Sequence, residues 1–293
     1  MYKSLNEHLR ERFGTKVYKI ALSSGCTCPN RDGTVGVGGC IFCADTGSGD
    51  FAQSACLPIN EQIKLAKEKI IDKNKGGKYI AYFQSFTNTY GSVEMLEAKF
   101  MEALADEEVV ALSIATRPDC LPVDILQMLA RLNSIKPVWV ELGLQTIHEE
   151  TARYIRRGYS LGVYDKAVKD LHTIGVEVIT HVIIGLPGES KEDMLATVRY
   201  VVDSKSEGIK LQLLHVIEGT DLADDYRTGF FDTLSMDEYI DIIQECVALI
   251  PPTTVIHRLT GDGNKKTLLA PLWSRDKKKV LNALNKALRS EEV

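Results

Sequence analysis

Three cysteines near the start of the chain are the side chains best suited to chemistry. Cys28, Cys40 and Cys43 lie in a glycine-rich stretch that has neither helical nor strand periodicity. Thiolates brought together on a loop bind soft metals, and cysteine thiolates hold iron–sulfur clusters. Three close ligands, with the aromatic Phe42 just before the last, predict a cluster in which one iron is left open for chemistry.

A fourth cysteine, Cys26, leaves a zinc site as the alternative. Structural zinc takes four ligands in a tetrahedral arrangement, and neighbouring cysteine ligands are usually separated by two or more residues. Only Thr27 separates Cys26 from Cys28. The spacing therefore favours an iron–sulfur cluster on the other three cysteines, with Cys26 beside it, over a closed zinc site.

The bulk composition is typical of a soluble globular protein. The 293 residues are 44% hydrophobic and 26% charged, enough for one large α/β domain or two modest ones. A formal net charge of -5 gives no global attraction to nucleic acid or anionic membrane, so only local basic patches such as Lys277–Lys279 remain. The seven cysteines, without a signal-peptide pattern or a bilayer-length apolar run, predict a reducing, cytoplasmic setting.

Strand-like and helix-like segments alternate six times along the chain. The expected strands cover residues 16–22, 78–84, 109–116, 138–144, 176–185 and 209–216. The expected helices cover about 4–12, 60–72, 93–104, a segment after Pro122, segments between the strand 138–144 and Ile174, 190–204, 235–250 and the basic C-terminal segment. Near-continuous hydrophobic strands are typical of a parallel sheet with both faces covered, either open and doubly wound or closed as a barrel. We expect residues 1–229 to form this unit and residues 230–293 to be an extension packed on it.

Unusual polar peptides follow all six expected strands. They are the cysteine loop, QSFTNTY, TRPD, Gln145, GLPGE and HVIEGT, in chain order. In either architecture ligands bind at the carboxyl ends of the strands, so these peptides should share one rim. Glu141 and Gln145 are both polar in an apolar strand, and Gln145, at its end, is the better placed to meet a ligand.

A His-Arg pair near the C-terminus is the candidate for holding an anionic substrate. His257 and Arg258 follow a short expected strand and precede a Gly-Asp-Gly turn that contains Asp262. Guanidinium and imidazole groups beside such a turn can bind anionic groups. We therefore predict that these three residues contact the substrate and take part in catalysis.

In these motifs the chain resembles the radical S-adenosylmethionine (radical SAM) superfamily. Its C-x11-C-x2-C spacing resembles the Elp3-like branch, and CPNRDGT, YFQSFTNTY, ATRPDCL, ELGLQT, HVIIGLPGE and IHRLTGDGN resemble the YhcC/YtqA-like family. The resemblance implies an α/β fold, a partial (β/α)6 TIM-like barrel with a C-terminal extension. It also implies a [4Fe–4S] cluster on Cys28, Cys40 and Cys43, and S-adenosylmethionine as the second cofactor.

The resemblance further implies how the cofactors act and which residues hold them. One electron, from a reductant such as flavodoxin or ferredoxin, cleaves S-adenosylmethionine to a 5′-deoxyadenosyl radical that takes a hydrogen atom from the substrate. The residues that match cofactor contacts, or that lie in the corresponding peptides, are Phe42, Gln84, Ser85, Thr87, Gln145, Arg157 and His215.

The resemblance to the YtqA-like branch implies tRNA as the substrate. In that reaction the carboxymethylaminomethyl side chain of the wobble uridine becomes aminomethyl. Two alternatives stay open: a radical SAM enzyme acting on a small metabolite, and a zinc-binding nucleic-acid or scaffold protein without catalysis.

Overall fold

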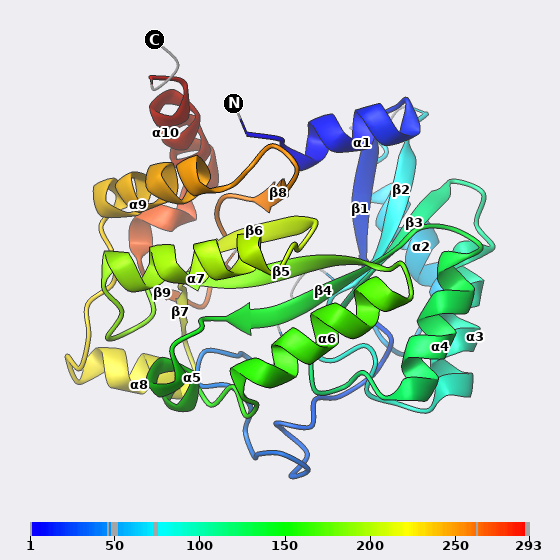
Figure 1. Ribbon diagram of the computed structural model, residues 1–293, viewed down its shortest axis with the longest axis horizontal. Coiled ribbons are helices and arrows are strands. Elements are labelled where there is room, and N and C mark those ends of the chain that lie inside the picture. Colours follow the sequence, from blue (N-terminus) through cyan, green and yellow to red (C-terminus); the bar gives the residue numbers. More distant parts are fainter. Residues whose placement is uncertain (1, 46, 48–51, 73–75, 262, 291–293) are drawn as a thin grey trace.

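The sheet at the centre of the protein has seven parallel strands and curls into a partial barrel (Figure 1). The computed structural model describes residues 2–45, 47, 52–72, 76–261 and 263–290. The strands lie side by side in the order β1 (Val17–Leu22), β2 (Lys78–Phe83), β3 (Val109–Thr116), β4 (Val138–Gln145), β5 (Glu177–Ile184), β6 (Gly208–Leu213) and β8 (Val255–Arg258). The expected partial (β/α)6 barrel is confirmed, and β8 adds a seventh strand to it.

Helices follow most strands and cover the outer face of the sheet (Figure 1). They are α2 (Ile59–Glu68), α3 (Val93–Leu104), α4 (Val123–Asn133), α5 (Glu149–Tyr154), α6 (Leu161–Thr173), α7 (Lys191–Asp203), α8 (Asp221–Arg227) and α9 (Met236–Leu249). Two begin with a capping box, Ser190 with Asp193 and Ser235 with Glu238, which satisfies free backbone N–H groups and fixes where the helix starts. Within the described residues, no helix is long and apolar enough to cross a membrane.

The C-terminal segment completes the barrel instead of standing apart from it. It supplies β8 to the sheet, and α10 (Lys277–Ser290) packs on α9. A short antiparallel pair, β7 (Val216–Ile217) and β9 (Leu268–Ala270), lies beside the barrel with the 3-10 helix η1 (Leu272–Arg275). The expectation that His257 and Arg258 follow a strand is wrong, because both residues belong to β8.

The two edges of the described sheet are β1 and β8. The first helix, α1 (Leu5–Phe13), contacts both of these strands, and Ser4 bridges to Ile256 of β8. Side chains alternate across a strand, so every second residue points into the barrel. At the amino-terminal ends of the strands the inward residues form an apolar floor with α1: Leu9, Val17, Ile80, Ala111, Trp139 and Ile179. This floor closes the barrel below the site.

Candidate active site

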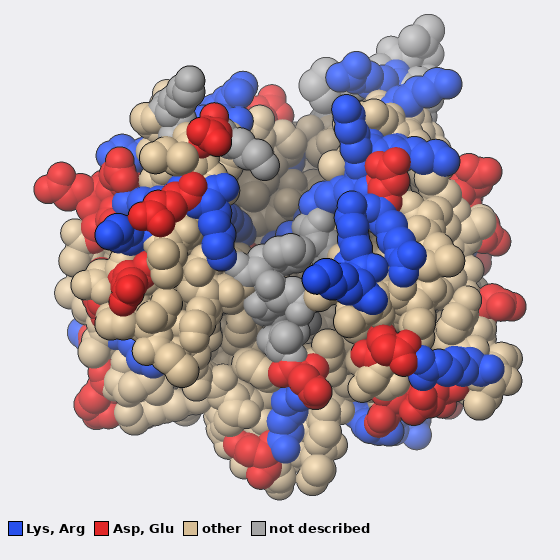
Figure 2. All heavy atoms as spheres, turned by 180° about the vertical axis from the view of Figure 1, so that it is seen from behind, with Lys and Arg blue, Asp and Glu red and all other residues tan. Residues whose placement is uncertain are grey.

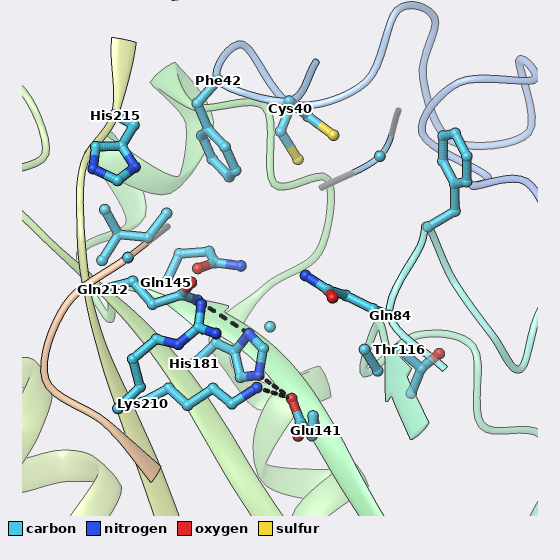
Figure 3. Close-up of a pocket in the computed structure, with 18 of the residues that line it drawn as sticks. Cys40, Phe42, Gln84, Thr116, Glu141, Gln145, His181, Lys210, Gln212 and His215 are labelled. Carbon is cyan, nitrogen blue, oxygen red and sulfur yellow. Dashed lines mark hydrogen bonds and ion pairs between the residues drawn. The ribbon is translucent and has the colours of Figure 1, made fainter. Parts of the chain in front are cut away.

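A cavity of about 620 Å³ extends through the barrel from the cysteine loop to the apolar floor. Cys28, Cys40 and Cys43 line one end of it, and Leu9 and Val17 line the other. Figure 3 shows this space, with Cys40 and Phe42 on one side and Glu141 and Lys210 on the opposite side. The polar peptides after the strands and the interior of the barrel therefore face a single chamber.

The cysteine loop keeps its shape through side-chain contacts with backbone, without regular secondary structure. Asn30 Nδ2 donates to the carbonyl of Arg156 (2.6 Å) and to Cys40 Sγ (3.4 Å). Arg31 donates to the carbonyls of Cys43 and Ala44, each at 2.7 Å. These bonds tie the loop to itself and to the segment after β4, so the thiols are held toward the cavity.

The three thiols fit an iron–sulfur cluster. Burial raises the pKa of Cys40 to about 12, with Cys43 and Cys28 adding to it, and burial also raises the pKa of Cys43. Three neighbouring thiolates in this setting therefore need a positively charged partner, which the irons of a cluster supply. Across the described residues, no three His, Cys, Asp or Glu side chains are gathered closely enough for a single metal ion. A cluster of four irons is larger than one ion and takes ligands that are further apart.

Cys26 lies away from these thiols. It is buried in the main hydrophobic core, and it does not line the cavity. A Cβ added at Gly91, near the start of α3, would lie 3.6 Å from its sulfur. The position of Cys26 favours a ligand set of Cys28, Cys40 and Cys43, which stays a prediction.

Six of the seven residues predicted to hold S-adenosylmethionine line the cavity. They are Phe42, Gln84, Thr87, Gln145, Arg157 and His215, whereas Ser85 is buried and does not belong to the lining. Gln145 ends β4 with a left-handed φ of 69°, next to a shift in the β4–β5 register. Its Oε1 is buried and has no partner among the described residues. A buried acceptor is costly until a donor reaches it, so this amide fits a hydroxyl or amino group of S-adenosylmethionine.

The guanidinium of Arg157 forms most of its hydrogen bonds with backbone carbonyls. Its guanidinium donates to the carbonyls of Leu144 (3.3 Å), Thr146 (2.6 Å) and Tyr159 (3.0 Å), and it pairs with Glu149 at 3.2 Å. These bonds fix the peptide that carries Gln145 at the cavity wall. Arg157 therefore acts on the site at least partly by positioning this loop.

Six side chains in the middle of the barrel form a hydrogen-bonded group around Glu141. One residue comes from each of β1 to β6, and we call this group the polar layer: Lys19, Tyr82, Ser113, Glu141, His181 and Lys210. Glu141 Oε1 accepts from Lys19 Nζ and from Ser113 Oγ, both at 2.6 Å, and Oε2 accepts from His181 Nε2 at 2.7 Å and from Lys210 Nζ. His181 Nδ1 accepts from Gln212 Nε2 at 3.2 Å, and Tyr82 OH accepts from Lys210 at 3.2 Å. Figure 3 shows the contacts of His181 and Lys210 with Glu141.

The buried charges of the polar layer strongly shift one another's pKa values. Burial alone would raise the pKa of Glu141, but the ammonium groups of Lys19 and Lys210 outweigh it and hold that pKa well below its usual value. Burial lowers the pKa of Lys210 to about 7, although Glu141 opposes this shift. Burial and the charge of Lys210 lower the pKa of His181 to about 4. Glu141 is therefore ionised and His181 neutral near pH 7.

Most of the polar layer is not identified by the sequence pattern. That pattern favours Gln145 over Glu141 as a ligand contact, and it does not connect Lys19, His181 or Lys210 with either residue. The available signal was the polar side chain at an inward position of each apolar strand, as with Lys19 in β1 and Lys210 in β6. That signal is weak because one strand alone does not show which partner it meets.

The residues predicted for catalysis lie at the lower end of the cavity or beyond the described part of the chain. His257 stacks edge-on against Trp139 of the floor, with ring centres 5.8 Å apart. Arg258 lines the cavity, and its charge lowers the pKa of Lys210. Asp262 lies outside the described residues. The structure thus places His257 beside the floor, away from the cysteines, and Arg258 near the polar layer.

Comparison with known proteins agrees with this fold. The family model for the Radical SAM superfamily matches residues 25–201, and the model for the Radical_SAM C-terminal domain matches residues 206–290. The chain therefore belongs to the radical SAM superfamily, whose enzymes use a [4Fe–4S] cluster and S-adenosylmethionine.

Individual relatives show more specific similarities to this chain. It is 47% identical to YtqA of Bacillus subtilis (strain 168) over 99% of this chain and 90% of that protein. It is 33% identical to the tRNA uridine(34) acetyltransferase of Methanocaldococcus jannaschii over 60% of this chain and 34% of that protein. The solved structure of Methanocaldococcus infernus Elp3 matches with a TM-score of 0.67 at 20% identity, covering 90% of this chain and 63% of that chain, which shows a shared fold.

Proposed function

We propose that this radical SAM enzyme modifies the wobble uridine of tRNA, converting the carboxymethylaminomethyl side chain to aminomethyl. The observation that carries the proposal is the match to a protein named as a tRNA uridine(34) acetyltransferase, over 192 residues and 60% of this chain. Of the two relatives, YtqA matches at the higher identity and along nearly the whole chain. The sequence similarity to the first of these proteins supports uridine 34 of tRNA as the target.

The surface charge supports contact with RNA. The sequence of α10, KKKVLNALNKALRS, carries five basic residues and no acidic residue. Figure 2 shows Lys and Arg side chains on both sides of a hollow on one face of the molecule. Basic side chains of this kind bind phosphates without reading sequence, and they compensate locally for the net charge of -5.

The chemistry of the site supports the proposed reaction. When bound, the cluster and S-adenosylmethionine would supply hydrogen-atom abstraction at the carbon between the amine and the carboxylate. The substrate radical would return one electron to the cluster and become an imine, and water would hydrolyse the imine to the aminomethyl nucleoside and a two-carbon aldehyde acid. The chain's own residues have to hold the uridine side chain in the cavity and orient it below the cysteine loop. The enzyme also needs a one-electron reductant, for which a flavodoxin or ferredoxin is suited.

Nucleoside analysis of tRNA tests the proposal. A strain that lacks this protein should accumulate carboxymethylaminomethyluridine and lose the aminomethyl derivative, and the wild-type gene should restore the profile. A Cys40→Ala gene is the matched control and should not restore it. An unchanged tRNA profile, together with formation of 5′-deoxyadenosine from S-adenosylmethionine by the reduced protein, would instead indicate a small metabolite as the substrate.

A further inference from the structure

Two buried ammonium groups share a single carboxylate in the polar layer. Lys19 Nζ lies 2.6 Å from Glu141 Oε1, and Lys210 Nζ contacts Glu141 Oε2. The side chains of Glu141, Lys210 and Lys19 are 0%, 5% and 18% exposed, and neither lysine pairs with another acidic group among the described residues. Because a buried charge without a counter-charge is unfavourable, the trio has an excess of positive charge whenever Lys210 is protonated, and an anion would neutralise it.

The rest of the cavity wall adds no second carboxylate. Its charged lining, within the described residues, consists of Glu141 and six basic residues: Lys19, Arg31, Arg117, Arg157, Lys210 and Arg258. Three of these, Arg31, Arg117 and Arg157, pair with Asp45, Asp119 and Glu149, which do not line this cavity. Glu141 is therefore the one acidic side chain in the described lining that faces Lys19 and Lys210.

The polar layer lies inside the barrel, below the rim that carries the cysteine loop. The layer lies between the cysteine loop and the apolar floor, and the amide of Gln212 lines the wall between them. The floor offers no charged side chain, so an anionic group entering the barrel meets its partners at the level of Lys19 and Lys210. The Gln212 amide has a second N–H besides the one that it donates to His181, and this N–H is a further donor for a carboxylate oxygen.

We propose that the polar layer binds a carboxylate group of the substrate between Lys19 and Lys210. Naming that group as the carboxylate of the carboxymethylaminomethyl side chain rests on the proposed function. In this side chain one carbon separates the amine from the carboxylate. Anchoring the carboxylate therefore sets the depth of that carbon below the cysteine loop, and Glu141 keeps the two lysines in place while the site is empty.

The proposal predicts a pH dependence for binding. Lys210, whose pKa burial lowers to about 7, is faced by Glu141 of β4, His181 of β5, Lys19 of β1, Tyr82 of β2 and Arg258 of β8. An incoming carboxylate favours the protonated ammonium, so its affinity should fall by up to about tenfold per pH unit as the pH rises above 7. A carboxamide of the same shape should show no such fall.

The first test uses a small probe that does not depend on RNA. Holoenzyme reconstituted with the cluster and S-adenosylmethionine is titrated calorimetrically with N-methylglycine and with its carboxamide. We expect the wild type to bind the acid at least about tenfold more tightly than the amide, because a charged partner in a buried pair changes affinity by this much or more. Equal affinity for acid and amide would overturn the proposal.

Two variants with opposite expected signs separate binding from a structural role. Lys210→Met should weaken binding of N-methylglycine by roughly 30-fold, whereas Glu141→Gln should strengthen it, because the internal carboxylate no longer competes for the lysines. Lys166→Met, on the exposed side of α6, is the matched control and should change nothing. Circular dichroism and cluster absorbance establish that each variant is folded; a shift of both variants in the same direction would contradict the proposal.

A second probe distinguishes a failure of the carboxylate-site inference from a failure of the proposed function. Anticodon stem–loop RNA with carboxymethylaminomethyluridine is compared with the same RNA carrying methylaminomethyluridine, which lacks the carboxylate. A preference of at least about tenfold for the first RNA, lost in Lys210→Met, supports both. If the protein binds N-methylglycine but neither RNA, the carboxylate site is supported and the proposal of a tRNA substrate is wrong. Conversion of the RNA without a preference for the carboxylate overturns the inference alone.

Discussion

The cysteine loop and the polar layer face the same cavity, and the chain builds them in opposite ways. The loop takes its three thiols from one short segment, whose shape depends on local turns and on contacts of Asn30 and Arg31 with backbone. The polar layer takes one side chain from each of six strands, from Lys19 in β1 to Lys210 in β6. Cofactor ligands can therefore be encoded locally, whereas a binding surface inside a barrel forms only after all the strands have paired.

The largest expected effect is loss of the cluster when one of the three cysteines of the loop is changed. Changing Cys28, Cys40 or Cys43 to Ala should abolish the cluster, because each removes one of three ligands. Cys26→Ala should keep it, since Cys26 lies in the core. Iron content and visible absorbance after anaerobic reconstitution measure this, with unfolding by denaturant as the control for an intact barrel. Loss of the cluster in Cys26→Ala would show that the ligand set is wrong.

Removing the central carboxylate of the polar layer should lower the stability of the fold, whereas the cysteine changes should remove the cluster and leave the barrel intact. Glu141→Ala leaves two buried lysines without their carboxylate and should lower the free energy of unfolding by about 3–5 kcal/mol. Chemical denaturation of the apoprotein measures it, and Glu97→Ala, at an exposed pair with Arg131, is the control with an expected loss of about 1 kcal/mol or less. A loss for Glu141→Ala no greater than the control would mean that the layer contributes little to the fold.

The pH dependence of stability should come from the layer more than from the loop. Burial lowers the pKa of Lys210 from 10.5 to about 7, so between these values the unfolded chain binds more protons at this site than the folded chain. The stability contributed by Lys210 should therefore rise as the pH increases above about 7, by up to about 1.4 kcal/mol per pH unit. Apoprotein denaturation between pH 7 and 9 measures this rise. Lys210→Met should show a flatter dependence, and equal slopes in the two proteins would contradict the assignment.

The smallest expected effect concerns the support of the loop. Asn30→Ala removes the donor to the Arg156 carbonyl and to Cys40 Sγ, so it should lower the free energy of unfolding by about 1–2 kcal/mol. The rate at which the reconstituted cluster loses iron to a chelator should increase. Asn133→Ala is the matched control, because it also removes two hydrogen bonds, one to the Gly175 carbonyl and one from the Val138 N–H, and Asn133 does not line the cavity. An unchanged rate of iron loss would show that the loop does not depend on this side chain.

Much of the fold could be predicted from the sequence, because its signals are local. The helix Val93–Leu104 and the strand Val109–Thr116 have the bounds that hydrophobic pattern and capping residues indicate. The β8 strand was harder to place, since a short segment such as VIHR does not show whether it joins the main sheet. Its parallel pairing with β6 depends on contacts between segments that are distant in the chain.

The cofactor end of the site can be identified from the sequence alone. Cysteine spacing, the glycine-rich loop and the peptides after each strand identify a radical SAM barrel, because these features are contiguous and chemically distinctive. The residues below the cofactors can be recognised as a group only in the folded protein. Lys19, Glu141, His181 and Lys210 look like isolated polar residues in apolar strands, and they become one charged surface through the register of the sheet and its curvature. Buried charges act over the few ångströms that separate them in space, whatever their separation along the chain, so their role follows from the folded barrel.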